Sequence, residues 1–352
     1  MRPKTVCTRK RQSCAGALVS NPHIVVAGAG SIGCFVGGVL AAARHNITLL
    51  ARPRIAHEIR AHGLTLTDID GMAQRVDAEG LTLTDKPTCF ADADIILVTV
   101  KSGDTATMAR AIAAHAPAQA RVISLQNGTE NAETLRAVLA NSDVRAGMVP
   151  FNVVPMGQGC FHRASSGDIM IEAGSGALAQ ALRVPQLAIE ETADITQIQW
   201  GKFLMNLNNA LNALSGLTLQ NQLRDRRWRK LLADQWAEAL RILTASGIEP
   251  SSAMPVPVGL IPTILRLPTP LFSCIATSML TIDAQARTSM SYDLMAKRRT
   301  EIDAFQGQVV RMGVKAGLAT PISAMVVDVM KLAETAKQGL PNLPVKALRR
   351  EI

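Results

Sequence analysis

The stretch that decides the fold is "HIVVAGAGSIGCFVGGVLAAARH", residues His23–His45. A short apolar run is followed by glycines in the G-x-G-x-x-G pattern, namely Gly28, Gly30 and Gly33. The first glycine allows a tight turn, the second lets a pyrophosphate approach the backbone, and the third lets the following helix pack on the strand. A phosphate then lies at the positive end of that helix, near Ser31 and Ile32. The stretch therefore predicts a dinucleotide-binding strand–turn–helix unit.

The next strand, "NITLLARPR", carries the residue expected to contact the ribose, about twenty positions after the glycines. An acidic residue there accepts from a 2′-hydroxyl and indicates NAD, but this chain has Arg52, with Arg54 close behind. No acid occurs from Ala51 through His57. Because a guanidinium pairs well with a 2′-phosphate, the pattern favours NADP(H). The alternative is an ordinary surface arginine.

The pattern of strand, polar loop and helix continues along the chain. Buried strands are expected in "ADIILVTVKSGD" and "ARVISLQNGTEN", a β-hairpin over 63–85, and further strands near "RAGMVPFNVVP" and "GDIMIEAG", up to about residue 175. This alternation is typical of an α/β fold with a parallel, doubly wound sheet.

After about residue 195 the pattern becomes helical. Helices are expected over 197–216, 226–247, 275–286, 293–317 and 321–337, with a proline-rich connection after the second. We therefore predict an α/β domain over 21–195 followed by an all-α domain over 196–340. Residues 1–20 are expected to form a disordered basic extension and residues 341–352 a C-terminal tail. A ligand site is expected in the cleft between the domains.

Composition excludes several classes of function. The net charge is +9, but five of the positive residues lie in the first eleven positions: Arg2, Lys4, Arg9, Lys10 and Arg11. Basic and aromatic residues are not interleaved, so small anionic ligands are favoured over nucleic acid. No apolar segment precedes Asn21 and no run of about 18 apolar residues exists, which predicts neither a signal peptide nor a membrane span.

The cysteines and histidines do not form a metal motif. The six cysteines are scattered without a CxxC pair, as expected of reduced thiols in a cytoplasmic protein. His57, Glu58 and His62 come nearest to HExxH, but the spacing is one residue too long, so a solvated helix face is expected instead. The sequence predicts no metal site.

The stretch "QWGKFLMNLNNALNALSG" places four asparagines in a predicted helix, where asparagine is unfavourable. At about 100° per residue, Lys202, Asn206 and Asn209 lie within about 60° of one another. The opposite side carries a leucine stripe: Leu204, Leu207, Leu211 and Leu214. One face is therefore expected to be buried. The other is either an ordinary solvated face or one wall of a site.

Several motifs together resemble those of the ketopantoate reductase (2-dehydropantoate 2-reductase) family. They are "GAGSIG", "TVKSGD", "LQNG", "WGKFLMNLNNALNALSG" and "TSMSYDLMAKRRTEID", in family order and over nearly the whole chain. The resemblance implies an N-terminal Rossmann-type domain, an all-α C-terminal domain and NADPH-dependent reduction of a 2-keto acid.

The resemblance also implies roles for particular residues. Lys202 matches the general acid of the family, Asn206 the asparagine beside it, and Glu301 the glutamate that contacts the substrate hydroxyl and the catalytic lysine. The chemistry is consistent, because hydride addition to a keto carbon leaves charge on oxygen, which needs a proton and a donor. Burial of an ammonium lowers its pKa from about 10.4 toward 7–8 and suits it to that role. Glu301 could instead be a surface helix residue.

Three further matches lie around the expected cleft. Ser289 matches a serine that contacts the substrate carboxylate, and it could instead cap a helix. Asn127 and Lys101 match residues at the nicotinamide end, where Glu301 also borders the cofactor. Lys101 could instead lie in water at the end of a strand.

The chain departs from the family pattern at some positions. A second asparagine is expected eight residues after Lys202, but that position is Ala210, and Asn209 could substitute. Lys297 stands where glycine is usual, and Thr288 replaces a serine. These departures concern the identity of the 2-keto acid more than the type of reaction.

The leading hypothesis is NADPH-dependent reduction of 2-dehydropantoate (ketopantoate) to (R)-pantoate. Two alternatives remain, namely the same chemistry on another 2-keto acid and a non-catalytic NADP(H)-binding sensor. The joint presence of Lys202, Asn206 and Glu301 speaks against a sensor, which needs no proton donor. The sequence is compatible with a homodimer but does not determine the oligomeric state.

Overall fold

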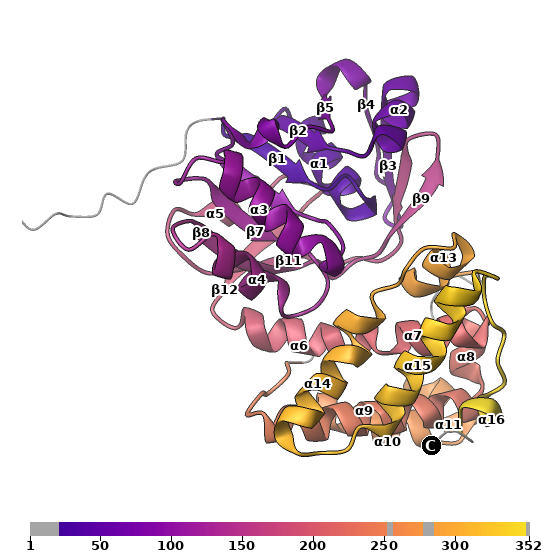
Figure 1. Cartoon of the computed structure of the whole chain (residues 1–352). Coiled ribbons are helices and arrows are strands. Elements are labelled where there is room, and N and C mark those ends of the chain that lie inside the picture. Colours follow the sequence, from indigo (N-terminus) through magenta and orange to yellow (C-terminus); the bar gives the residue numbers. More distant parts are fainter. Residues whose placement is uncertain (1–20, 252–255, 277–284, 350–352) are drawn as a thin grey trace, which may run out of the picture.

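The computed structural model describes residues 21–251, 256–276 and 285–349. It shows an N-terminal sheet domain followed by a helical domain, as the sequence predicts (Figure 1). The expected basic extension over 1–20 and most of the helix expected over 275–286 lie outside the described residues.

The sheet domain is built on an eight-stranded sheet in the described part of the chain, with the order β12-β11-β8-β7-β6-β1-β2-β5. The six strands β8, β7, β6, β1, β2 and β5 are parallel to one another. Strand β11 runs antiparallel to β8, and β12 is parallel to β11. The central strands are apolar and buried along their length, as expected for a sheet covered on both faces. The strands are β1 His23–Ala27, β2 Asn46–Leu50, β5 Thr82–Thr84, β6 Ile95–Val98, β7 Arg121–Ser124, β8 Asp143–Met148, β11 Ile169–Glu172 and β12 Ile189–Thr192.

Helices cover both faces of this sheet. Residues of α1 join one buried core, and residues of α3 and α4 join the core on the other side. This arrangement confirms the doubly wound α/β domain. The α-helices are α1 Ser31–Ala42, α2 Pro53–His62, α3 Thr105–His115, α4 Asn131–Val138 and α5 Leu178–Leu182, and the short 3-10 helices are η1 Ala78–Gly80, η2 Pro87–Phe90 and η3 Ser102–Asp104.

A second sheet of four strands differs from the sequence-based expectation. Its order is β4-β3-β10-β9, and its strands are β3 Leu64–Asp68, β4 Ala73–Val76, β9 Val153–Gly157 and β10 Cys160–Arg163. The expected hairpin over 63–85 therefore ends at Val76, and β5 instead pairs with β2 in the main sheet. The second half of "RAGMVPFNVVP" forms β9 of this second sheet. It joins the sheet because β9 pairs with β10, and β10 pairs with β3, which lies far away in sequence.

The helical domain has a separate apolar core, to which the leucine stripe of α6 and α7 contributes. Its α-helices are α6 Ile195–Asn206, α7 Asn208–Ser215, α8 Leu219–Arg224, α9 Arg226–Ala245, α10 Ile261–Arg266, α11 Thr269–Ile275, α13 Ser289–Met295, α14 Gln306–Ala316, α15 Pro321–Ala336 and α16 Val345–Leu348, with the 3-10 helices η4 Val258–Leu260 and η5 Ile302–Ala304. Residues expected to form a tail from 341 onward include α16, whose Val345 and Leu348 are buried in this core.

The helix expected over 293–317 is broken into α13, η5 and α14. α13 ends at Met295, and Lys297 in the following turn has a φ of 55°, which lies in the left-handed region. A residue with a Cβ pays roughly 1 kcal/mol or more to adopt that conformation, whereas glycine does not. The cost explains why glycine is usual at the matching position of the family. In this chain Lys297 adopts the same left-handed conformation at some cost in stability.

No helix within the described ranges is both long enough and apolar enough to cross a membrane.

Candidate active site

The glycine turn between β1 and α1 has the geometry of a phosphate cradle. Gly28 has a φ of 110°, and a Cβ there would lie 2.6 Å from a methyl carbon of Val100. A Cβ on Gly33 would lie 2.3 Å from the Gly28 carbonyl oxygen, so the helix could not pack as closely. A Cβ on Gly30 would meet no protein atom within 4 Å, so the space beside it is open. Ser31 and Ile32 begin α1, which has no acidic residue in its first turn.

Arg52 lies just after β2 and is the N-cap residue of α2. Its side chain is 85% exposed and reaches Asp104 at 3.4 Å, a weak surface pair. The guanidinium is therefore available to an anionic ligand at the carboxyl end of β2.

Lys202 projects from α6 toward the sheet domain. Trp200 and Phe203 of α6 are buried in the helical core, and Phe203 packs against Phe305 with ring centroids 5.5 Å apart, which fixes the rotation of α6. The Lys202 Nζ donates to the Val149 carbonyl oxygen, just after the end of β8. Burial lowers the pKa of Lys202 to about 8, while the negative charge of Glu301 acts in the opposite direction. At neutral pH the ammonium thus holds a proton that it can release readily.

Asn206 lies one helical turn after Lys202 on α6, Asn209 lies beside Asn206, and Ser289 lies beside Asn209. The Asn209 Nδ2 is 3.4 Å from Asn206 Oδ1 and 3.5 Å from Ser289 Oγ, so α7 and the first residue of α13 meet here. Ser289 is exposed and is not the helix cap, which is Thr288. Ala210 is fully buried, so the residue at this position faces the core. The structure thus places Asn209, and not residue 210, beside Asn206.

The other two asparagines, Asn208 and Asn212, do not face the candidate site but hold parts of the helical domain together. Asn208 and Asn212 are buried, and both donate to Gln222 Oε1, while Gln222 Nε2 donates back to Asn208 Oδ1. Asn212 Oδ1 also accepts from the Thr288 N–H and the Ser291 hydroxyl. The amide of Asn212 therefore holds the start of α13, and of the four asparagines only Asn206 and Asn209 face the site.

Glu301 reaches from the helical domain to the sheet domain. Its Oε1 accepts from the Ser102 N–H at 3.2 Å and from the Ser102 hydroxyl at 3.1 Å. Its Oε2 has no hydrogen-bond partner among the described residues. Glu301 is half-buried, and its charge acts on Lys202. The sequence-based alternative of a surface helix residue does not describe this position.

Lys101 does not lie free in water at its strand end. Its Nζ is 2.6 Å from Asp293 Oδ2 on α13 and 3.1 Å from the Arg299 carbonyl oxygen. Asp293 is almost fully buried and also pairs with Arg298 at 3.3 Å. In this arrangement Lys101 joins the two domains.

Asn127 follows β7 and contributes to the site mainly through its backbone. Its carbonyl oxygen accepts from the Ser102 hydroxyl at 2.9 Å and from Asn131 Nδ2 at 2.6 Å. Its side-chain amide is half-exposed and has no hydrogen bond among the described residues. That amide is therefore available to a ligand.

Ser102 and Asp293 also belong to the candidate site, although they are not among the residues predicted from the sequence. Ser102 directly follows Lys101 in "TVKSGD", and Asp293 lies four residues after Ser289, one helical turn along α13. These spacings could have indicated both residues. Their partners, Glu301 and Lys101, lie in the other domain and could not be found from local sequence.

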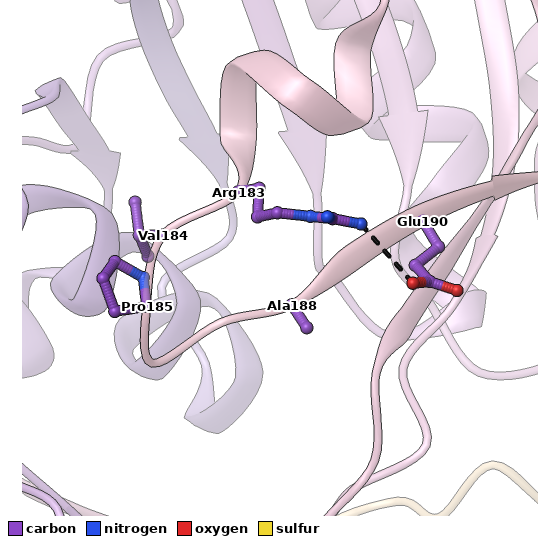
Figure 2. A pocket seen from close by; sticks show the side chains of 5 residues that line it. All are labelled: Arg183, Val184, Pro185, Ala188 and Glu190. Carbon is purple, nitrogen blue, oxygen red and sulfur yellow. Dashed lines mark hydrogen bonds and ion pairs between the residues drawn. The ribbon is translucent and has the colours of Figure 1, made fainter.

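One hollow of the described chain lies away from these residues. A hollow of about 420 Å³ is lined by Arg183, Val184, Pro185, Ala188 and Glu190 (Figure 2). Arg183 crosses it toward Glu190 at 3.4 Å and also donates to the Ile189 carbonyl oxygen. It contains none of the candidate site residues. Within the described ranges, no group of three or more histidine, cysteine or acidic side chains could hold a metal ion.

Comparison with protein families matches both domains. Residues 24–176 match the family described as Ketopantoate reductase PanE/ApbA, and residues 194–334 match Ketopantoate reductase PanE/ApbA C terminal. A curated relative is 2-dehydropantoate 2-reductase of Halobacterium salinarum, 29% identical over 321 residues that cover 89% of this chain and 99% of the relative.

Solved structures have the same fold. A PanE/ApbA family ketopantoate reductase from Ralstonia eutropha JMP134 has a TM-score of 0.77 at 29% identity, covering 90% of this chain and 99% of that one. D-mandelate dehydrogenase with NADH and anilino(oxo)acetate has a TM-score of 0.74 at 21% identity, with the same coverage, and that likeness concerns the fold alone. Because the two family models match in order and together span both domains, the chain belongs to the ketopantoate reductase family of oxidoreductases.

Proposed function

We propose that this protein reduces 2-dehydropantoate to (R)-pantoate with NADPH, using Lys202 as the general acid. The observation that carries the proposal is the lysine itself. Its pKa is lowered to about 8 by burial, the charge of Glu301 acts on it, and Asn206 lies one helical turn further along the same helix, beside Asn209. Family membership and the relatives named 2-dehydropantoate 2-reductase support the same reaction.

The glycine turn fits a nicotinamide dinucleotide. The open space beside Gly30 and the first turn of α1 suit a pyrophosphate, which an acidic residue in that turn would repel. Arg52 would hold the 2′-phosphate of NADPH, and the free amide of Asn127 would contact the nicotinamide end. When bound, NADPH supplies the hydride that adds to the keto carbon of the substrate.

The remaining chemistry belongs to the side chains of this protein. Lys202 donates its proton to the keto oxygen as charge develops there. Asn206 and Asn209 are uncharged donors that orient the carbonyl and carboxylate groups, and Ser289 adds a hydroxyl beside them. Glu301 has one unpartnered oxygen, which would accept from the substrate hydroxyl. A 2-keto acid that carries a hydroxyl is thus the best chemical match.

The direct test measures NADPH oxidation with a panel of 2-keto acids. We expect the highest kcat/KM for ketopantoate, and a lower value for 3,3-dimethyl-2-oxobutanoate, which is ketopantoate without its hydroxyl. Higher activity on the second compound would support the same type of reaction but on a 2-keto acid other than ketopantoate. Tight NADPH binding with no turnover on any member would point to a sensor and refute the proposal.

The cofactor preference tests Arg52. We expect wild type to prefer NADPH over NADH, and Arg52→Asp to lose or reverse that preference. A charge-assisted hydrogen bond is worth about 1.5–3 kcal/mol, which corresponds to about tenfold or more in kcat/KM. Arg60→Asp, at an exposed arginine on the last turn of the same helix, serves as a control for charge alone. Equal kcat/KM for the two cofactors in wild type would contradict the assignment.

A further inference from the structure

Ser102 joins the catalytic carboxylate to the sheet domain through two hydrogen bonds. Its N–H and its hydroxyl both donate to the same oxygen, Oε1 of Glu301, at 3.2 and 3.1 Å. We infer that Ser102 is a positioning residue: it commits one oxygen of Glu301 to the sheet domain, so that the other is left for Lys202 and the substrate. The inference rests on the proposed function, in which Glu301 and Lys202 act together.

The Ser102 hydroxyl can donate to Glu301 because Asn131 donates to the other acceptor within its reach, the Asn127 carbonyl oxygen. A hydroxyl has a single proton, and Ser102 Oγ lies within reach of both the Asn127 carbonyl oxygen, at 2.9 Å, and Glu301. Asn131 Nδ2 donates to that same carbonyl oxygen at 2.6 Å and to Ser102 Oγ at 3.2 Å. The carbonyl therefore stays satisfied when the Ser102 proton points to Glu301.

A buried polar network holds Asn131 in place. Thr105 Oγ1 donates to Asn131 Oδ1 at 2.8 Å and accepts from Gln126 Nε2 at 2.7 Å. Gln126 also donates to the Val100 carbonyl oxygen and accepts from the Ser124 hydroxyl, at the end of β7. These groups are buried, so each bond would be costly to break. Ser102 is thus fixed to the rigid edge of the sheet.

The backbone on the other side of the contact is fixed as well. Glu334 on α15 accepts from both the N–H and the hydroxyl of Thr300, at 2.7 and 2.6 Å. The Thr300 hydroxyl in turn accepts from the Ile302 N–H at 3.2 Å. Residue 301 is therefore held at its backbone by the helical domain and at its carboxylate by Ser102.

The position of the carboxylate matters because its charge acts on Lys202. Glu301 is the charged side chain that raises the Lys202 pKa against the effect of burial. The neighbouring charges at this domain contact, Lys101 and Asp293, are paired with each other, and Arg298 pairs with Asp293. A carboxylate freed from Ser102 would spend less time near Lys202, so the lysine pKa would fall.

The experiment compares two hydroxyl deletions at the domain contact. Ser102→Ala removes a bond to Glu301, whereas Thr129→Ala removes the bond from Gln308 Nε2 to Thr129 Oγ1, at 2.7 Å, which joins the same domains without touching Glu301. The Lys202 pKa is read by NMR titration of the full protein labelled with ¹³C-lysine, with the resonance assigned by its loss in Lys202→Met. Glu301→Gln removes the carboxylate charge and so gives the Lys202 pKa expected when Glu301 no longer acts on it.

We expect Ser102→Ala to lower the Lys202 pKa in the direction of Glu301→Gln, and Ser102→Thr and Thr129→Ala to titrate like wild type. With ketopantoate, kcat should fall about threefold to tenfold in Ser102→Ala, and its decline at high pH should begin at lower pH. Equal changes in Ser102→Ala and Thr129→Ala would assign the effect to domain closure and overturn the inference. So would a wild-type titration in Ser102→Ala.

The titration needs no turnover, which separates the two ideas. If wild type reduced no 2-keto acid while the Lys202 pKa still followed Ser102, the proposed function would fail and the positioning role would stand. If wild type reduced ketopantoate and Ser102→Ala matched it in both pKa and kcat, only the positioning role would fail.

Discussion

Replacing Lys202 by alanine is expected to lower kcat by about 10²–10⁴, because the developing charge on the keto oxygen loses its proton donor. NADPH binding should change little, since the glycine turn and Arg52 lie in the other domain. Steady-state kinetics and a fluorescence titration with NADPH measure the two quantities separately. Small amines added to the variant should restore part of the rate.

A matched control separates this effect from a loss of charge. Lys230→Ala removes an exposed lysine of α9 in the same domain and should leave kcat unchanged. A Lys202→Ala variant that kept more than about half of the wild-type kcat would show that the proton comes from another group.

The pH dependence of the wild-type rate follows from the same residue. A general acid acts only when protonated, and the pKa of Lys202 is lowered to about 8. The rate should therefore be constant with respect to this group below that pH and should fall about tenfold per pH unit above it. This decline at high pH should be absent from the pH profile of the activity that remains in Lys202→Ala.

Glu301→Gln is expected to lower kcat/KM for ketopantoate by about ten- to a hundredfold, and to do so more strongly than for 3,3-dimethyl-2-oxobutanoate. Ser102 donates twice to one oxygen, so the amide of the variant should turn its carbonyl to Ser102 and its NH₂ to the site. The substrate hydroxyl would then lose its acceptor, and such a bond to a charged group is worth about 1.5–3 kcal/mol. A site built to bond a hydroxyl also discriminates strongly against analogues without it.

The comparison of the two substrates contains its own control. Both lose the effect of Glu301 on Lys202, but only ketopantoate loses a bond to its hydroxyl. Glu301→Ala should likewise compress the wild-type preference between them. If wild type reduced both equally well and each variant slowed them by the same factor, Glu301 would act only on Lys202, and the pantoate assignment would lose its main structural support.

The sequence by itself determined the fold class and predicted one face of the candidate site. The glycine turn, the apolar strands and the change to helical periodicity after about residue 195 are local patterns, and the structure has the corresponding elements. The shared face of Lys202, Asn206 and Asn209 also follows from helical geometry alone. Local spacing is sufficient in these cases because hydrogen bonding within a helix or strand sets the direction of each side chain.

Only the tertiary structure decided which polar groups meet. Asn208 and Asn212 have the same residue type as Asn206 and Asn209, yet Gln222 and the start of α13 bury them in the helical domain. The pairing of β3 with β10 is equally nonlocal and moved an expected strand into a second sheet.

The domain contact is the clearest example. Ser102 and Glu301 are separated by almost two hundred residues, and neither carries a local pattern that indicates the other. Their contact exists because α6 packs on the carboxyl end of β8 while Thr300 and Glu334 hold the loop before η5. Burial and charge at Lys202 arise from that packing, so its lowered pKa is a property of the folded domains and not of the α6 sequence.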